Sequence, residues 1–268
     1  MTTMFKDKVI AITGAASGIG RALAEELAER GAKLALSDLD AGAVGAVIAA
    51  LPAGTEARGY ALDVSRREAF EQFALDVQAD FGSAHYIINN AGTSVFATVE
   101  NQTIEEIEKV LAVNLWGVIY GTKAFLPIML RQREGCIVNI SSVFGLVASP
   151  CSVSYNISKF GVRGLTETLW QELDGTGVRA VVVHPGGINT NIKHVPDAHQ
   201  SGALERAVLQ ANVRKMTTTP RECARQIVDG LRRGKPRLLV GNGAKALFWL
   251  SRLLPDRYGV VLRRELGV

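Results

Sequence analysis

The sequence predicts an α/β protein built on one doubly wound sheet of about seven parallel strands, with helices on both faces. Short apolar runs alternate with longer helical stretches along the whole chain, which is typical of this class. The runs are continuously apolar, as strands buried on both faces are. No linker, charge run or internal repeat divides the 268 residues. We therefore expect a single domain over residues 1–243 and a C-terminal extension over residues 244–268.

The strand candidates are Val9–Thr13, Lys33–Ser37, Ala57–Leu62, Tyr86–Asn89, Cys136–Ile140, Val178–Val183 and Arg237–Val240. The helix candidates are Gly18–Arg30, Arg66–Phe81, Ile104–Arg131, Val153–Asp174 and Pro220–Arg233. The glycine-rich stretch Ala41–Gly45 reads as a weak helix rather than a linker. In such sheets the ligand binds at the carboxyl ends of the strands, where the strand order reverses.

Composition and charge exclude several classes of protein. The net charge is only +4, and residues 232–268 hold nine Lys or Arg against Asp256 and Glu265. A basic terminal segment without an aromatic-rich groove predicts no nucleic-acid partner. Three dispersed cysteines and four histidines without ligand spacing predict buried thiols and no metal. With no run of 18 apolar residues and no signal peptide, we expect a cytoplasmic protein.

A glycine-rich turn follows the first strand directly and opens the first helix. It holds Gly14, Ser17, Gly18, Ile19 and Gly20. Glycines at these positions allow a tight turn, close approach of the backbone to a pyrophosphate, and close packing of helix on strand. The helix N-terminus then faces the phosphate charge. The turn predicts a dinucleotide site of the Rossmann-like type.

Asp38 ends the second strand, where a carboxylate can accept hydrogen bonds from both adenosine ribose hydroxyls. Against a 2′-phosphate it would cost about 1 to 4 kcal/mol in repulsion. Asp38 therefore favours NAD over NADP, the alternative being a helix-capping role. Two further sets of candidate cofactor residues follow later strands. They are Asp63 and Val64, for adenine, and Asn90, Ala91 and Gly92, for the ribose.

Tyr155 and Lys159 lie four residues apart on a predicted helix, so they share one face. An ammonium beside a phenol stabilises the phenolate, and we expect Lys159 and an oxidised cofactor to lower the pKa of Tyr155 toward 7. Such a tyrosine acts as general acid or base at a carbonyl or alcohol oxygen. Ser142, at the end of the fifth strand, would hold that oxygen by a hydrogen bond.

Taken together, these motifs resemble the main, single-domain branch of the short-chain dehydrogenase/reductase superfamily over about residues 6 to 240. The resemblance implies that Asn114, Ser142, Tyr155 and Lys159 are the catalytic residues, with Asn114 ordering a water next to Lys159. It implies further cofactor contacts from Pro185, Gly186, Ile188 and Thr190. It also implies a homodimer or homotetramer paired through the long helices.

The segment 187–216 is where such enzymes carry a substrate lid. Its apolar residues, including Ile192, together with Phe96 and the run from Phe144 to Val147, suggest a lipophilic substrate; the alternative is that they only pack the lid. The extension 244–268 reads as a basic amphipathic helix ended by Pro255. It could lie on an anionic membrane surface, cover its own pocket or form a dimer contact.

The function we expect is NAD-dependent interconversion of a lipophilic secondary alcohol and its ketone, with Tyr155 as general acid/base. The alternative within enzymes is an NADPH-linked 3-oxoacyl or other keto reductase, against which Asp38 and the extension speak. A further alternative, outside the enzymes, is a scaffold protein that binds the cofactor without turnover. The unsubstituted catalytic positions argue against it.

Overall fold

All seven predicted strands form in the computed structural model, which describes residues 4–190 and 202–266. Their bounds are β1 Val9–Thr13, β2 Lys33–Asp38, β3 Ala57–Ala61, β4 Tyr86–Asn89, β5 Gly135–Ile140, β6 Val178–Pro185 and β7 Arg237–Val240. They pair in parallel in the order β3-β2-β1-β4-β5-β6-β7. The predicted fold class is confirmed, and the strand order reverses between β1 and β4, which places the expected ligand site beside these two strands.

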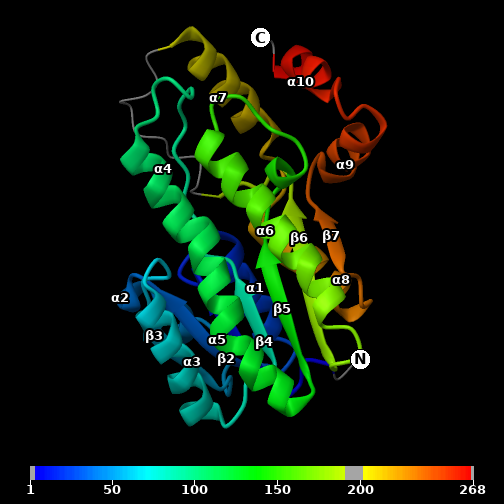
Figure 1. Ribbon diagram of the computed structural model, residues 1–268. Coiled ribbons are helices and arrows are strands. Elements are labelled where there is room, and N and C mark those ends of the chain that lie inside the picture. The colour runs from blue at the N-terminus through cyan, green and yellow to red at the C-terminus, as the bar shows by residue number, and fades with distance from the viewer. Residues whose placement is uncertain (1–3, 191–201, 267–268) are drawn as a thin grey trace.

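Helices cover both faces of the sheet (Figure 1). One layer contains α1 (Gly18–Ala28), α2 (Ala41–Ala49) and α8 (Pro220–Arg232). The other contains α3 (Arg67–Phe81), α4 (Ile104–Leu111), α5 (Gly117–Gln132) and α6 (Val153–Glu172). Three more helices gather beyond the carboxyl ends of the strands: α7 (Ala203–Lys215), α9 (Ala244–Leu253) and α10 (Tyr258–Leu266).

Strand β1 shows why the central runs are apolar without alternation. Ile10 and Ile12 pack under the layer of α1 and α8, whereas Val9 and Ala11 pack under the layer of α3 and α5. Strand β3 departs from the prediction that every strand is buried on both faces. It is one of the two edge strands and pairs only with β2, so its residues Arg58, Gly59 and Ala61 are exposed.

The long helix expected over Ile104–Arg131 forms, but a π-helical segment, Ala112–Trp116, separates α4 from α5. By length and composition alone, the continuous stretch Ile104–Gln132 could cross a membrane. In the structure it packs on β4, β5 and α3, and 44% of its most apolar window is buried. It therefore behaves as a core helix of this fold.

The C-terminal extension packs on its own chain. Helix α9 contacts β7, and α10 contacts α7. Leu266 is buried with Phe96, Cys151 and Val208 in a small cluster above the sheet. The hydroxyl of Tyr258 accepts the Ala148 backbone N–H at 3.2 Å, joining α10 to the loop that follows β5. The extension thus covers part of its own subunit at the end of the molecule that holds the carboxyl ends of the strands.

Candidate active site

A cavity of about 720 Å³ opens at the carboxyl ends of the strands. Nearly all sequence-predicted site residues line it, from elements far apart in the chain. They are Gly14, Ser17, Gly18, Ile19, Asp38, Asp63, Val64, Asn90, Ala91, Gly92, Phe96, Ser142, Phe144, Tyr155, Lys159, Pro185, Gly186, Ile188 and Thr190. Gly20 and Asn114 lie behind its wall, and Ile192 falls outside the described residues. Among the described residues, no group of three His, Cys, Asp or Glu is placed to hold a metal ion.

The glycine turn has the geometry that a dinucleotide requires. Gly14 and Gly18 have φ values of +65° and +54°, which residues with a Cβ rarely adopt. A Cβ on Gly20 would lie 2.1 Å from the Gly14 carbonyl oxygen, so the turn closes only on glycine. Ser17 precedes α1 without making a side-chain cap. The first turn of α1 therefore faces the cavity uncapped, as an anion site needs.

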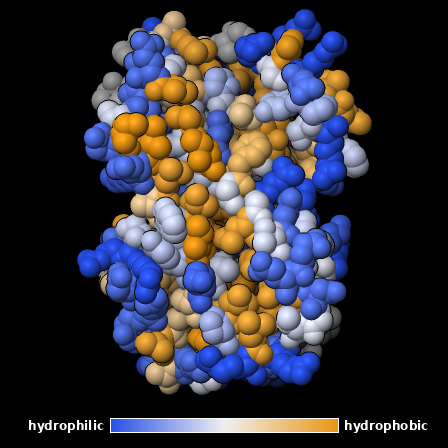
Figure 2. All heavy atoms as spheres, in the orientation of Figure 1, coloured by the Kyte–Doolittle hydropathy of each residue, from blue (hydrophilic) through white to orange (hydrophobic). Residues whose placement is uncertain are grey.

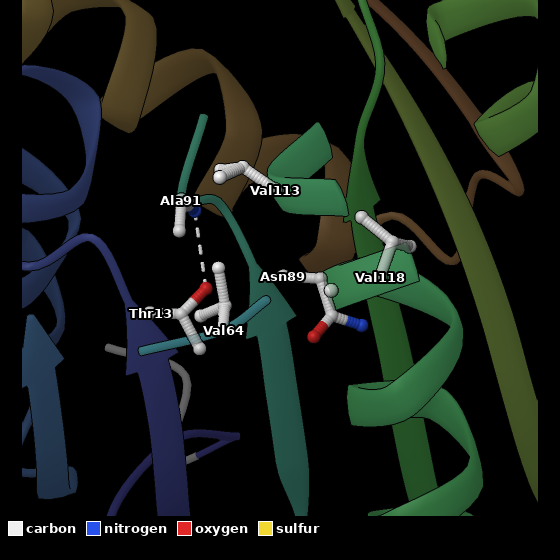
Figure 3. Close-up of a pocket in the computed structure, with 7 residues that line it drawn as sticks. Thr13, Val64, Asn89, Ala91, Val113 and Val118 are labelled. Carbon is white, nitrogen blue, oxygen red and sulfur yellow. Dashed lines mark hydrogen bonds between the residues drawn. The ribbon is translucent and has the colours of Figure 1, made fainter. Parts of the chain in front are cut away.

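The carboxyl ends of β1 and β4 are fastened to each other, as Figure 3 shows for Thr13 and Ala91. The Thr13 hydroxyl accepts the backbone N–H groups of Asn90 and Ala91, both at 3.1 Å. The Asn90 side chain donates to the carbonyls of Thr13 and Gly14, at 2.9 and 3.1 Å. Asn90 thus supports the glycine turn, while Ala91 and Gly92 bring backbone to the cavity wall.

Asp38 is held against the glycine turn. Its two carboxylate oxygens accept the backbone N–H groups of Ala16, at 3.0 Å, and Leu39, at 2.8 Å. The cap of α2 is Asp40, which accepts the N–H of Ala43. The alternative that Asp38 is a helix cap is therefore wrong. Asp38 is left as a fixed carboxylate on the cavity wall.

Asp63 and Val64 form the neighbouring part of this wall. One oxygen of Asp63 accepts both the backbone N–H and the hydroxyl of Ser65, at 3.0 and 2.6 Å. These bonds orient the carboxyl at the end of β3, where the sequence places an adenine contact.

Helix α6 carries Tyr155 and Lys159 one turn apart at the floor of the cavity. The Lys159 ammonium donates to the Ile140 carbonyl at 2.9 Å and lies 5.4 Å from the centre of the Tyr155 ring. The Ser142 hydroxyl lies near the Tyr155 hydroxyl and favours its phenolate form. The structure thus brings together Ser142, which follows β5, and Tyr155 and Lys159, which lie on α6.

Burial controls the protonation of this group. It raises the pKa of Tyr155, and the hydrogen bond from Ser142 offsets this only in part. Burial also lowers the pKa of Lys159 to about 8. The protein alone therefore does not lower the pKa of Tyr155 as expected, because desolvation of the phenolate outweighs the bond from Ser142. The expectation of a lowered pKa for Tyr155 also relies on the positive ring of an oxidised cofactor.

Asn114 sits in the π-helical segment and is fully buried. Its side chain accepts the Thr93 N–H and donates to the Thr93 carbonyl, both at 2.8 Å, and it donates to the Ser158 hydroxyl at 3.3 Å. The amide therefore pins the loop after β4 to α6, beside Lys159. The water that the resemblance places between Asn114 and Lys159 stays a prediction.

Three residues at the site, His184, Leu247 and Tyr258, belong to no sequence motif. His184, fully buried at the end of β6, lies with Nδ1 2.8 Å from the Ser142 carbonyl; since a carbonyl only accepts, Nδ1 carries the proton. Burial lowers the pKa of this imidazole to about 4. In the sequence, the sign that could have pointed to His184 is a single histidine at the end of an apolar strand. Nothing in the sequence points to Leu247, which lines the cavity, or to the Tyr258 bond described above.

Apolar side chains line part of the cavity beside the catalytic residues. Its walls include Phe96, Phe144, Leu209, Met216 and Leu247. The Phe144 ring stands edge-on to Tyr155, with ring centres 6.2 Å apart. The expectation that the run from Phe144 to Val147 faces the pocket holds only for its first residue, Phe144. Leu146 and Val147 are buried below the cavity, because the 3₁₀ turn Val143–Gly145 directs them inward.

This fold and site define an oxidoreductase with a nicotinamide-type cofactor site, and comparison with known proteins agrees. The family model described as short chain dehydrogenase matches residues 8–201. A Mycobacterium tuberculosis protein named as an oxidoreductase, SadH, is 42% identical over 257 residues, covering 95% of this chain and 93% of its own. Estradiol 17-beta-dehydrogenase 11 of Homo sapiens is 31% identical, covering 97% and 84%.

Among solved structures, a short-chain dehydrogenase/reductase from Burkholderia phymatum, in complex with NAD, superposes with a TM-score of 0.85. It is 33% identical and the match covers 97% of this chain and 96% of that one. Levodione reductase follows with a TM-score of 0.79 and 29% identity, covering 90% and 99%. The chain belongs to the short-chain dehydrogenase family, which confirms the resemblance seen in the sequence.

Proposed function

We propose that this protein interconverts a lipophilic secondary alcohol and its ketone, with NAD as the hydride acceptor or donor. The observation that carries the proposal is the meeting of Ser142, Tyr155 and Lys159 at the floor of a cavity that begins at the glycine turn. The names of two relatives support the reaction class, since one is an estradiol dehydrogenase and one a levodione reductase.

The chain's own residues handle the proton and the substrate oxygen. Tyr155 takes the hydroxyl proton in alcohol oxidation and returns it to the carbonyl oxygen in reduction. Ser142, which lies beside Tyr155, holds the same oxygen. Lys159 stabilises the phenolate, and its bond to the Ile140 carbonyl fixes its position. When bound, the nicotinamide cofactor supplies or accepts the hydride. The apolar walls exclude water from the reacting atoms.

The preference for NAD is tested by titrating the purified protein with NADH and with NADPH at equal ionic strength, following cofactor fluorescence. We expect NADH to bind at least about tenfold more tightly, because Asp38 would repel a 2′-phosphate. Asp38→Ser should lose most of this preference. Asp40→Ser is the matched control, since Asp40 caps α2 and does not line the cavity. Equal affinity of the wild type for both cofactors would contradict the assignment.

The same titration separates the alternatives. Tighter binding of NADPH would favour the 3-oxoacyl or other keto reductase. Binding of NADH without turnover of any alcohol or ketone would favour a cofactor-binding scaffold.

We also propose a homodimer or homotetramer paired through the long helices. Apolar side chains are exposed on α4, the π-helical segment and α6, namely Ile104, Trp116, Ile157 and Phe160. Figure 2 shows hydrophobic side chains gathered over this side of the molecule. Such a patch on a single chain is typical of a subunit contact.

Replacing Trp116 and Phe160 together with Glu should convert the oligomer to monomer, because a carboxylate would be buried unpaired in the interface. Light scattering measures the mass. Leu75→Glu, at an exposed position on α3, is the control. A wild type that is already monomeric would contradict the proposal.

A further inference from the structure

Helix α9 exposes a stripe in which apolar and basic side chains share one face. Lys245, Trp249, Arg252 and Leu253 are spaced by four, three and one residues, which places them on one side of a helix. Trp249 is 57% exposed and Leu253 is 73% exposed. The other side of α9 is directed inward: Ala244 is buried, and Leu247 lines the cavity. The exposed stripe is thus not required to pack α9 on the core.

The neighbouring helix continues this surface. Val260 of α10 is 44% exposed, and Arg257, Arg263 and Arg264 are exposed around it. Between Lys245 and Leu266 there are five basic residues against Asp256 and Glu265. Glu265 is paired with Lys215 of α7 at 3.4 Å. At this end of the molecule, hydrophobic and hydrophilic side chains lie side by side over α9 and α10 (Figure 2).

This surface adjoins the substrate end of the cavity. Asn242, Gly243 and Leu247, which line the cavity, lie directly before α9 or in its first turn. Trp249 follows Leu247 by two residues but points out of the protein. The polypeptide that forms part of the cavity wall is therefore the same one that presents the exposed stripe.

We propose that the stripe of α9, with the basic side chains of α10, docks the protein on an anionic lipid surface and so turns the substrate end of the cavity toward the bilayer. The inference about substrate entry rests on the function proposed above. The inference that the protein docks on a lipid surface does not. A lipophilic substrate dissolved in a bilayer would then reach Leu247 without crossing water.

The chemistry of the stripe fits a lipid headgroup layer. Tryptophan and leucine enter the boundary between headgroups and acyl chains, while lysine and arginine remain among the headgroups. Basic residues near an anionic surface each strengthen binding to it. Arg252 also stacks over Phe248, 4.8 Å from the ring centre, which holds its cation beside Trp249.

A second copy of the chain fits the same stripe less well. In a two-fold symmetric contact the patch meets itself, so Lys245 and Arg252 would face their own copies. Like charges brought together in an interface oppose association. The basic character of the stripe therefore favours an anionic surface over self-association.

The test is co-sedimentation of the full-length protein with vesicles of equal parts phosphatidylglycerol and phosphatidylcholine, and with pure phosphatidylcholine vesicles. We expect binding to the anionic vesicles alone, weakened by salt. Lys245→Glu with Arg252→Glu should lower partitioning at least about tenfold. The matched control is Arg233→Glu with Lys235→Glu, which makes the same charge change just before β7, at the opposite end of that strand. Equal loss with both double variants, or no binding by the wild type, would overturn the proposal.

A second measurement locates the contact. Brominated lipids should quench the fluorescence of the wild type, and Trp249→Phe should remove most of this quenching while Trp116→Phe should not. Unchanged quenching in Trp249→Phe would overturn the docking geometry, as would a fall in mass by light scattering in Trp249→Ser, which would assign the stripe to a second copy. Tyr155→Phe should bind vesicles as the wild type does, because docking does not depend on turnover. A wild type that binds vesicles but turns over no alcohol or ketone would refute the proposed function and leave docking intact.

Discussion

Replacing Tyr155 with phenylalanine should lower kcat/KM for alcohol oxidation roughly 10³-fold while leaving NADH affinity within about twofold of the wild type. The substitution removes one hydroxyl, which lies beside Ser142 at the floor of the cavity. The ring remains, so its contact with Phe144 is preserved. Steady-state rates with a lipophilic secondary alcohol, together with cofactor fluorescence, separate loss of proton transfer from loss of binding.

The matched control for this variant is Tyr120→Phe, because Tyr120 lies on α5 against Trp116 and does not line the cavity. It should retain wild-type rates. Wild-type turnover by Tyr155→Phe would remove Tyr155 from the reaction. A large fall in NADH affinity would instead assign its hydroxyl to cofactor binding.

The sequence predicts the sheet and its cofactor edge well because both depend on local features. A strand buried on both faces must be continuously apolar, and β1, β4 and β7 have the predicted bounds. The glycine turn is visible because steric limits at Gly14 and Gly20 allow no other residue. Strand β3 is the exception, since its place at the edge depends on pairing between distant segments, which no local pattern records.

Features that depend on tertiary contacts could not be predicted from the sequence. The π-helical segment around Asn114 lies in a uniformly helical pattern, and its amide acts through Thr93 and Ser158 from other elements. The proton on Nδ1 of His184 is assigned only when the Ser142 carbonyl is seen beside it. In the same way, an amphipathic pattern predicted the α9 helix but could not decide which side of it would pack.

The protonation of the catalytic group also follows from burial rather than from spacing. A four-residue separation places Lys159 beside Tyr155, yet it says nothing about desolvation. In the folded chain Lys159 is 3% exposed, and its pKa falls to about 8. The ammonium that supports the phenolate is therefore itself close to losing its proton in the weakly alkaline range.

Replacing Lys159 with methionine should lower kcat/KM for alcohol oxidation at neutral pH by roughly 10² to 10³ and move its rise with pH to higher pH. In the wild type, Lys159 is charged below about pH 8. An ammonium 5.4 Å from the centre of the Tyr155 ring should favour the phenolate. Without that charge, burial still raises the pKa of Tyr155, so the base forms only at higher pH. The pH profile of kcat/KM measures this shift.

The Lys159→Met variant also leaves the Ile140 carbonyl without the donor that it has at 2.9 Å, which could weaken the fold by about 1 to 3 kcal/mol. Urea unfolding and NADH binding measured on the same variant separate that effect from the catalytic one, because a merely destabilised enzyme would lose rate equally at every pH. Lys123→Met, on the exposed side of α5, controls for loss of a positive charge. A pH profile that falls in height but keeps its midpoint would show that Lys159 supports the loop after β5 and not the phenolate.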